Sequence, residues 1–276
     1  QNGTVTLTEK ETGKIYTNLN YFEETGDQGD YWIYYPPYHN KTFNSLGAAA
    51  DIWYEENGEL SATIAAKVKM TVPAYGIINK NMVQGESCRS EETTEIDIVT
   101  YYTLKKEAKA VAVKTQINNT AKDHRMRVVF DTGIKTENAY SAGHFYVDER
   151  STIPQGELYY PEMQTLPKGY FTTLENEKGG FSFVDNCTCE YEATKDGKLA
   201  ITLFRGVRNI ICTEFRSAGA FPHENGGQSL GELTFEYELY PFSKNETVML
   251  AERMSAPVKA VQTSKGLGKG DDRNSF

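Results

Sequence analysis

Apolar and polar residues alternate along much of this chain, with a period of two. Four stretches show the pattern clearly: 60–72, 110–118, 198–206 and 232–242. In the first, every second residue from Leu60 to Val72 is apolar, and Ser, Thr and Lys occupy most positions between. Because successive side chains of a strand point to opposite faces, the pattern predicts half-buried antiparallel strands with these apolar side chains inward. In the last stretch, the predicted inward face is Leu233, Phe235, Tyr237 and Leu239.

Turn signals separate the alternating stretches. They are Glu11-Thr12-Gly13, Asn57-Gly58, Gly179-Gly180, Asp196-Gly197 and Gly226-Gly227. No stretch longer than a turn or two has the spacing of an amphipathic helix, and the 18 Tyr and 13 Phe suit strands. The chain has no interior linker and no internal repeat. We therefore expect an all-β fold, a large antiparallel β-supersandwich that forms a single domain over residues 1–276.

Composition and charge narrow the range of partners. Charged residues make up 24% of the 276 residues and hydrophobic residues 39%, which is ordinary for a globular protein. The net charge of -9 argues against nucleic acid, because binding phosphates needs a basic face. No apolar run approaches the roughly 18–20 residues that cross a membrane. We expect neither nucleic acid nor a membrane as a partner.

The sequence offers little catalytic chemistry. It has no GxSxG, GxGxxG, P-loop or HExxH motif. Cys187 and Cys189 share one face of a strand without a histidine at ligand spacing, so we interpret them as packed thiols and not as a zinc site. The four histidines, His39, His124, His144 and His223, are far apart and are interpreted as satisfied core or surface residues. We expect no catalytic residue and no metal site in this chain, and a binding or supporting role.

One stretch stands out for its aromatic residues, 26-GDQGDYWIYYPPYHN-40. Its aspartates and glycines are typical of turns, and we expect the acidic side chains to bond the local backbone. The two prolines should end any strand ladder, so that Tyr31–Tyr35 forms an edge segment that faces another domain. Part of residues 31–38 should therefore belong to an exposed apolar patch.

Several segments together resemble the C-terminal region of the family 38 glycoside hydrolases, the α-mannosidases, and most of all their bacterial branch. They are 9-EKETGKIYTNLNYFEETGDQGD-30 with Pro36-Pro37, 114-KTQINNTAKDHRMRVVFDTGI-134, 197-GKLAITLFR-205, 228-QSLGELTFEYELYP-241 and 256-APVKAVQT-263. They follow the family's order over nearly the whole chain. The second is the most specific, because K-D-H-R before an apolar strand that ends in T-G-I is not a generic β pattern.

The resemblance implies a sandwich of the galactose-mutarotase type that packs on its own N-terminal catalytic domain, absent here. In the family, a carboxylate of that domain attacks the sugar and zinc grips the mannose hydroxyls. None of those groups maps onto this chain, so zinc belongs to the parent enzyme and the chain alone should be inactive. The expected substrate is an α-mannoside and the expected location the cytoplasm. Homo-oligomerisation of the full enzyme is left open.

Two positions are implied to reach the sugar in the intact enzyme. The family places a tyrosine four residues before the proline that follows the Gly-Asp turn, and here Trp32 stands there, with Tyr31 or Tyr34 as the alternative. The family also carries an arginine at the end of the strand that matches 197–205, which is Arg205. The structural alternative for the aromatic residues is simple packing at a domain interface. For Arg205 it is an ordinary surface ion pair. If Arg205 belongs to the site, we expect that it also recognises an acidic aglycone such as glycerate.

Two other functions stay open at this point. The tyrosines and the tryptophan suit an independent carbohydrate-binding module. A free-standing sugar epimerase on the same type of sandwich would need a His/Glu acid–base pair on a concave face. Whether His124 or His144 faces a carboxylate therefore tests this function.

Overall fold

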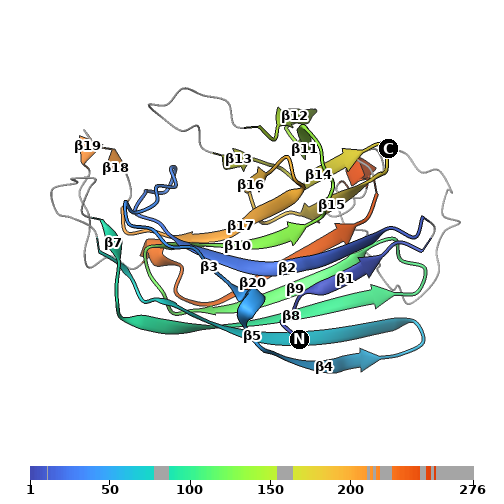
Figure 1. The fold of residues 1–276 in the computed structure, drawn as a ribbon, viewed down its shortest axis with the longest axis horizontal. Coiled ribbons are helices and arrows are strands. Elements are labelled where there is room, and N and C mark those ends of the chain that lie inside the picture. The colour runs from blue at the N-terminus through green and yellow to red at the C-terminus, as the bar shows by residue number, and fades with distance from the viewer. Residues whose placement is uncertain are drawn as a thin grey trace, which may run out of the picture.

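The computed structural model describes residues 1–10, 12–77, 87–153, 164–209, 212–213, 216–217, 226–242, 247–249 and 252. Its first large sheet has seven antiparallel strands, drawn across the middle of Figure 1. In spatial order these are β1 (Val5–Thr8), β2 (Ile15–Gly26), β10 (His124–Asp131), β17 (Lys198–Gly206), β16 (Glu190–Ala193) and β13 (Leu166–Pro167), with β3 (Phe43–Asn44) beside β2.

The second large sheet has nine antiparallel strands. In spatial order they are β12 (Val147–Ser151), β11 (Asn138–Ala142), β14 (Phe171–Asn176), β15 (Gly179–Asp185), β20 (Gly231–Tyr240), β9 (Val111–Asn119), β8 (Thr93–Lys105), β5 (Ser61–Pro73) and β4 (Ala50–Asn57). Two strand pairs stand apart, β6 (Gly76–Ile77) with β7 (Cys88–Arg89) and β18 (Cys212–Thr213) with β19 (Arg216–Ser217). The 3₁₀ helices are η1 (Ser45–Gly47) and η3 (Gly226–Gln228).

The main hydrophobic core lies between the two large sheets. Phe130 on β10 packs against Phe183 on β15, with ring centroids 5.7 Å apart, and Phe183 packs against Tyr237 on β20 at 4.9 Å. All three side chains are buried. Because the inward rows of both sheets interdigitate, the fold is an antiparallel β-sandwich, and the prediction of an all-β fold is confirmed.

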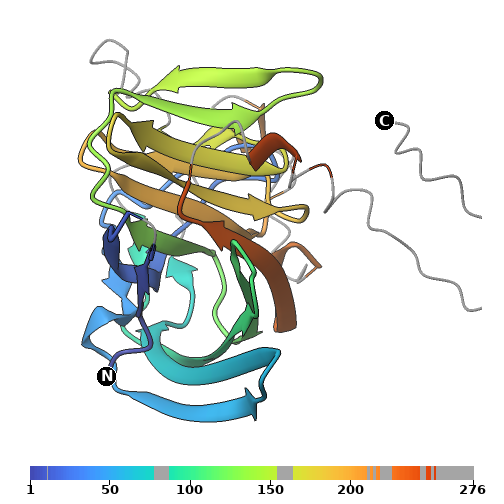
Figure 2. The same ribbon diagram turned by 90° about the vertical axis from the view of Figure 1, so that its right-hand side faces the viewer.

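The alternating stretches form the predicted strands β5, β9, β17 and β20. The inward face is correct for β20 and for Ala66–Val72 of β5, but Leu60 (72% exposed) and Ile64 (41%) lie outside the core. This part of the prediction is wrong because Leu60 and Ile64 lie near the turn from the edge strand β4, where Tyr54, the partner of Ile64, is also exposed. Figure 2 shows β4 and β5 (light blue, bottom) at the opposite end of the molecule from β12 (yellow-green, top).

The predicted turns mostly join neighbouring strands. Residues 12–13 lie between β1 and β2, Asn57-Gly58 between β4 and β5, and Asp196-Gly197 between β16 and β17. Gly197 has φ +90°, and a Cβ there would lie 2.5 Å from the backbone nitrogen of Ile134, so this position requires glycine. Gly179-Gly180 instead begins β15, and Gly226-Gly227 lies in η3.

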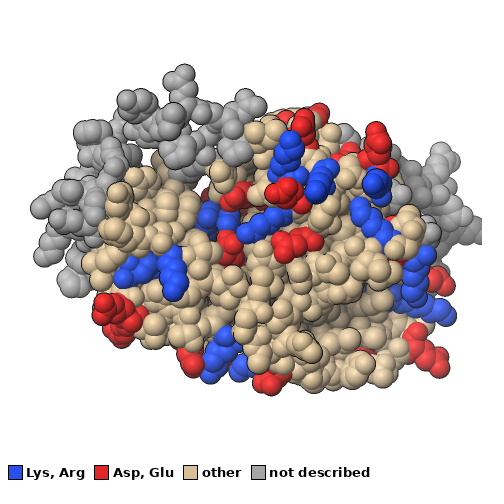
Figure 3. All heavy atoms as spheres, in the orientation of Figure 1, with Lys and Arg blue, Asp and Glu red and all other residues tan. Residues whose placement is uncertain are grey.

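The outer face of the seven-stranded sheet carries a row of paired charges. Glu23 on β2 accepts hydrogen bonds from Arg127 on β10 and, at 3.0 Å, from Lys198 on β17. Arg127 also bonds Glu192 on β16. The side chains of Glu23 and Arg127 are buried. Basic and acidic side chains also lie mixed on the face drawn in Figure 3, without a broad patch of one sign among the described residues.

The titration of Glu23 links this charge row to pH. Burial opposes ionisation of Glu23, yet the charges and hydrogen bonds of Arg127 and Lys198 lower the pKa of its carboxyl below the ordinary value of 4.5. A lowered pKa in the folded state adds stability above the unfolded-state pKa, and this contribution is lost as the pH falls through the folded value.

We therefore expect Glu23→Gln to destabilise the chain most at neutral pH, with the difference from the wild type shrinking as the pH falls below about 4.5. Urea denaturation over this range measures it. The control is Glu95→Gln, which removes an exposed pair with Lys69 and should have little effect at any pH. A difference that stays constant with pH would contradict the assignment.

Candidate functional site

Two aspartates fold the aromatic stretch after β2 into a loop. The buried Asp27 carboxylate accepts hydrogen bonds through Oδ1 from the backbone N–H groups of Gly29 (2.9 Å) and Tyr35 (3.2 Å). Asp30 Oδ1 accepts from the N–H groups of Trp32 and Ile33, both at 2.8 Å. The predicted role of the acidic side chains is confirmed. Residues 31–35 form a loop and not an edge strand, because these turns replace ladder pairing.

Arg205 holds this loop against the end of β17. Its Nε donates to Asp27 Oδ2 at 2.7 Å, and its Nη2 donates to the Ile33 carbonyl at 2.7 Å. Only 10% of the Arg205 side chain is exposed. Burial raises the pKa of the Asp27 carboxyl, and the Arg205 hydrogen bond and charge oppose that rise. Arg205, the predicted site arginine, is therefore bound to the Asp27 carboxylate of this chain and positions the loop.

The aromatic side chains of the loop point in two directions. Trp32 is 65% exposed and Tyr31 50%, with their rings tilted and 6.4 Å apart, and Tyr38 is 68% exposed. The expected exposure of apolar side chains within 31–38 is confirmed, and the patch itself stays a prediction. Tyr34 turns inward instead, and its hydroxyl donates to Thr25 Oγ1 at 3.3 Å. The predicted site residues Tyr31 and Trp32 thus lie on the surface, while Tyr34 lies beneath them against the sheet.

Arg125 on β10 is a site residue that the sequence did not single out. It lies opposite Thr25 on β2 and Arg205 on β17, so the three side chains share the outer face of the sheet. The Tyr34 ring lies 3.5 Å from its guanidinium carbon. Burial and then the charge of Arg127 lower the pKa of Arg125, and the negative charges of Asp27 and Glu192 oppose that fall. The K-D-H-R motif contained this arginine, but its contacts depend on strand register and not on the motif.

A cleft of about 460 Å³ opens beside the loop. Its lining includes Tyr31 and Arg205, and it also includes Thr188, Glu190 and Thr202. Within the described residues, Thr188 Oγ1, Glu190 Oε2 and Thr202 Oγ1 are buried without a hydrogen-bond partner. The residues give the cleft a polar wall, although these three oxygens themselves are buried beneath its surface. The structure therefore brings two predicted site residues to one polar cleft.

Cys187 and Cys189 lie at the same cleft. Both are exposed, so their interpretation as packed thiols is wrong: they fall in the connection between β15 and β16 and not in a strand. Burial of the thiol group and the neighbouring Asp185 raise the pKa of Cys187 to about 11, so the thiol stays protonated at neutral pH. Among the described residues, no group of three or more His, Cys, Asp or Glu is arranged to hold a metal ion.

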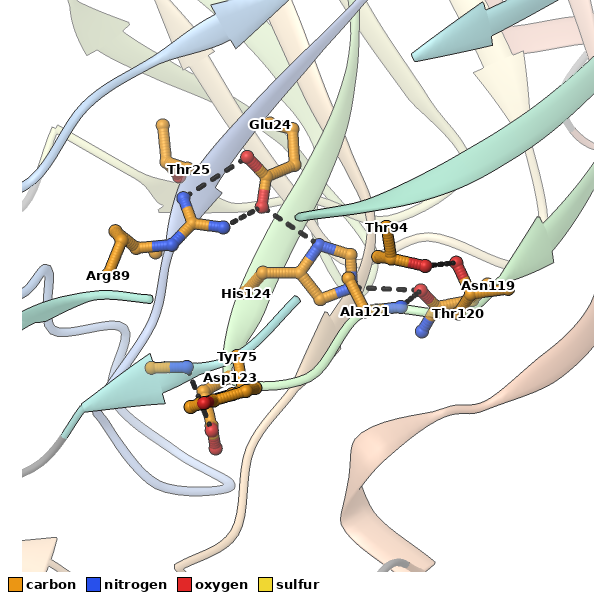
Figure 4. Close-up of polar contacts among 12 residues, drawn as sticks. Glu24, Thr25, Tyr75, Arg89, Thr94, Asn119, Thr120, Ala121, Asp123 and His124 are labelled. Atoms are coloured by element: carbon orange, nitrogen blue, oxygen red, sulfur yellow. Dashed lines mark hydrogen bonds and ion pairs between the residues drawn. The ribbon is translucent and has the colours of Figure 1, made fainter. Parts of the chain in front are cut away.

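His124 faces a carboxylate, as the epimerase hypothesis required, but in a closed interior. Its Nδ1 lies 3.1 Å from Glu24 Oε1 and its Nε2 lies 3.0 Å from Asn119 Oδ1. Figure 4 shows the ring between these two partners. Glu24 also pairs with Arg89. His124 and Glu24 are both 0% exposed, so no substrate reaches them. This buried network has a structural role, and it does not support acid–base chemistry on a sugar. His144 is exposed, and His223 lies outside the described residues.

Comparison with known proteins decides the family. Residues 1–209 match the family described as the glycosyl hydrolases family 38 C-terminal domain. The chain belongs to this family. It is 30% identical over 222 residues to a putative mannosylglycerate hydrolase of Halalkalibacterium halodurans, which covers 76% of the chain and 24% of that protein.

Solved structures of the family agree with the fold. An α-mannosidase from Enterococcus faecalis V583 superposes on 97% of the chain, and on 31% of its own chain, with a TM-score of 0.85 and 26% identity. A second family 38 glycosyl hydrolase from Enterococcus faecalis covers 92% of the chain and 30% of its own, with a TM-score of 0.79 and 26% identity. The chain thus spans about a quarter to a third of the length of these relatives. None of its described helices is long and apolar enough to cross a membrane.

Proposed function

We propose that this chain is the β-domain of a zinc-dependent, retaining α-mannosidase, in which it supports the catalytic domain and forms one wall of the sugar site. One observation carries the proposal: in a family 38 C-terminal domain, Asp27 and Arg205 anchor the loop that presents the exposed Tyr31 and Trp32 beside a polar cleft. Exposed aromatic side chains on an ordered loop suit contact with a sugar face or with a second domain.

The proposed division of roles follows from the side chains present. An indole stacks on the apolar face of a sugar ring and donates one N–H, which suits Trp32 for binding but not for proton transfer. Zinc and the attacking carboxylate would belong to the catalytic domain of the larger enzyme, which would act in the cytoplasm. The contribution of this chain is then the position and shape of the wall, with no catalytic residue of its own.

The test is Trp32→Ala in the enzyme that contains this domain. We expect kcat/KM on α-mannosides to fall by about tenfold or more, because the ring contributes contact area to the bound sugar. The melting temperature should stay unchanged, because Trp32 is exposed. The matched control is Tyr54→Ala on the edge strand β4, also an exposed aromatic, which should leave both quantities unchanged. Equal kcat/KM in wild type and Trp32→Ala would overturn the direct contact.

The exposed pair of Tyr31 and Trp32 also favours a second candidate, an independent carbohydrate-binding module. Titration of the chain with methyl α-mannoside, followed by tryptophan fluorescence, separates the two. Saturable quenching that Trp32→Ala abolishes supports the binding module. Lack of binding by the chain, together with the loss of kcat/KM in the larger enzyme, supports the wall of a shared site.

A further inference from the structure

The charges on the outer face of the seven-stranded sheet neutralise one another, apart from one cation. Arg127 bonds both Glu23 and Glu192, and Lys198 bonds Glu23. Arg205 bonds Asp27. Each of these basic side chains therefore has a carboxylate within ion-pair distance, and each of these carboxylates is already bound. Arg125, in the middle of the same face, is the exception among the described residues.

Arg125 is 4% exposed and has few partners for a buried cation. Its Nη1 donates to Thr165 Oγ1 at 3.0 Å, and the Tyr34 ring covers the guanidinium at 3.5 Å from Cζ. Nε is buried without a hydrogen-bond partner, and Nη2 makes no hydrogen bond within the part of the chain described. The free edge of the guanidinium is thus Nε with Nη2, the side-on fork that a carboxylate accepts with two parallel bonds.

Such an arrangement is costly for the isolated fold. Burying an arginine that has no carboxylate within ion-pair distance among the described residues loses solvation. One neutral hydroxyl, one aromatic ring and the more distant charges of Asp27 and Glu192 replace that solvation only in part. The neighbouring Arg127 increases the cost, because it places a second positive charge on the same strand face. A native fold keeps a buried charged group with unused hydrogen-bond donors mainly where a function uses it.

We propose that Arg125 binds a carboxylate group through Nε and Nη2, beneath the Tyr34 ring. Arg205, which the sequence suggested for this role, is less suited because its Nε and Nη2 already bond Asp27 and Ile33. The Tyr34 side chain can move aside for the carboxylate, since the bond that its hydroxyl makes to the sheet is a single one of 3.3 Å, to Thr25. The carboxylate belongs to a small acidic ligand or to a side chain of the rest of the enzyme, and the experiments below distinguish these sources.

The first experiment measures binding to the chain itself. The Nε–Hε resonance of Arg125, assigned with Arg125→Met, is followed by NMR while sodium glycerate is added, with glycerol as the matched neutral probe. We expect a saturable shift with glycerate and none with glycerol, and weaker binding in Arg125→Lys, which keeps the charge but loses the fork. An Arg125 resonance that moves with neither probe, or equally with both, overturns the proposal.

The second experiment tests whether Arg125 is simply structural. Melting temperatures of Arg125→Met and Arg127→Met are compared in the same chain. Because Arg125 has no carboxylate within ion-pair distance among the described residues, its replacement should leave the melting temperature unchanged or raise it. Arg127→Met instead leaves Glu23 and Glu192 without their partner and should lower it. A loss as large in Arg125→Met as in Arg127→Met overturns the proposal.

The third experiment identifies the source of the carboxylate and rests on the proposed function. In the larger enzyme, Arg125→Met is assayed on an α-mannoside of glycerate and on a neutral α-mannoside. A loss of kcat/KM of about tenfold or more for the glycerate substrate alone assigns the carboxylate to the substrate. Glycerate binding by the chain with no such selective loss assigns it to a side chain of the enzyme. Absence of mannosidase activity would defeat the proposed function and leave the NMR result intact.

Discussion

Replacing Asp27 with alanine is expected to lower the free energy of unfolding of this chain by about 3–5 kcal/mol, because it leaves a buried arginine without its partner. The Asp27 carboxylate is 0% exposed and joins Arg205 to the backbone N–H groups of Gly29 and Tyr35. Without it, the loop that carries Tyr31 and Trp32 loses its anchor to β17. Urea denaturation measures the stability, and hydrogen exchange of the N–H groups of Gly29 and Tyr35 measures the loop.

The matched control is Asp97→Ala, which removes an acidic partner of Lys67 on the exposed face of β8. Its side chain is 38% exposed, so the loss should stay below about 1 kcal/mol. If Asp27→Ala is no more destabilising than Asp97→Ala, or if the loop amides keep their protection, Asp27 does not organise the loop.

Replacing Glu24 with alanine is expected to cost a similar amount, about 3–5 kcal/mol, at the other polar centre of the fold. Glu24 is 0% exposed, accepts two hydrogen bonds from Arg89 at 3.1 and 2.5 Å, and lies 3.1 Å from His124 Nδ1. Its loss leaves the Arg89 guanidinium and the His124 ring buried without their common acceptor. Equilibrium denaturation in urea is the measurement.

Glu137→Ala is the control for this second centre. Glu137 pairs with Lys195 at 3.4 Å, but its side chain is 71% exposed, so the pair should contribute little. Ligand binding is a separate question from stability. A Glu24→Ala chain that is kept folded at low temperature should bind ligand normally, since His124 and Glu24 do not reach the surface. Ligand binding abolished in the folded variant would show that the pair has a functional role after all.

Sequence analysis could predict the strands, but it could not predict how much of each strand face is buried by the second sheet. Alternation places Ala66–Val72 and the inward row of β20 correctly, because the period of two is a property of the backbone itself. Leu60 and Ile64 have the same pattern and are nevertheless exposed, because they lie near the turn between β4 and β5, away from the interdigitated core. A pattern reports which side chains share a face, and only the second layer decides how much of that face is covered.

The candidate site divides in the same way. Resemblance and composition indicated Tyr31, Trp32, Tyr34 and Arg205, and the structure brings Tyr31 and Arg205 to one cleft with Trp32 on its rim loop and Tyr34 beneath. Arg125 was not singled out, because its partners come from residues 34 and 165 and from the register of three strands. The thiols at Cys187 and Cys189 were misjudged because the chain leaves β15 just before them.

By itself, the sequence determined the all-β class and the turn chemistry of the loop, because these depend on the strand period and on local hydrogen bonds. Its motifs carried the resemblance to the family. Asp27 and Asp30 bond backbone groups within eight residues of themselves, a distance that a sequence reveals. Tertiary structure alone decided which charges are neutralised. Arg205 reaches Asp27 across 178 residues, and Arg125, on the next strand, has no carboxylate within ion-pair distance in the part of the chain that the structure describes. Charge pairing depends on separation in space and on exclusion of water, and neither is a local property of the chain.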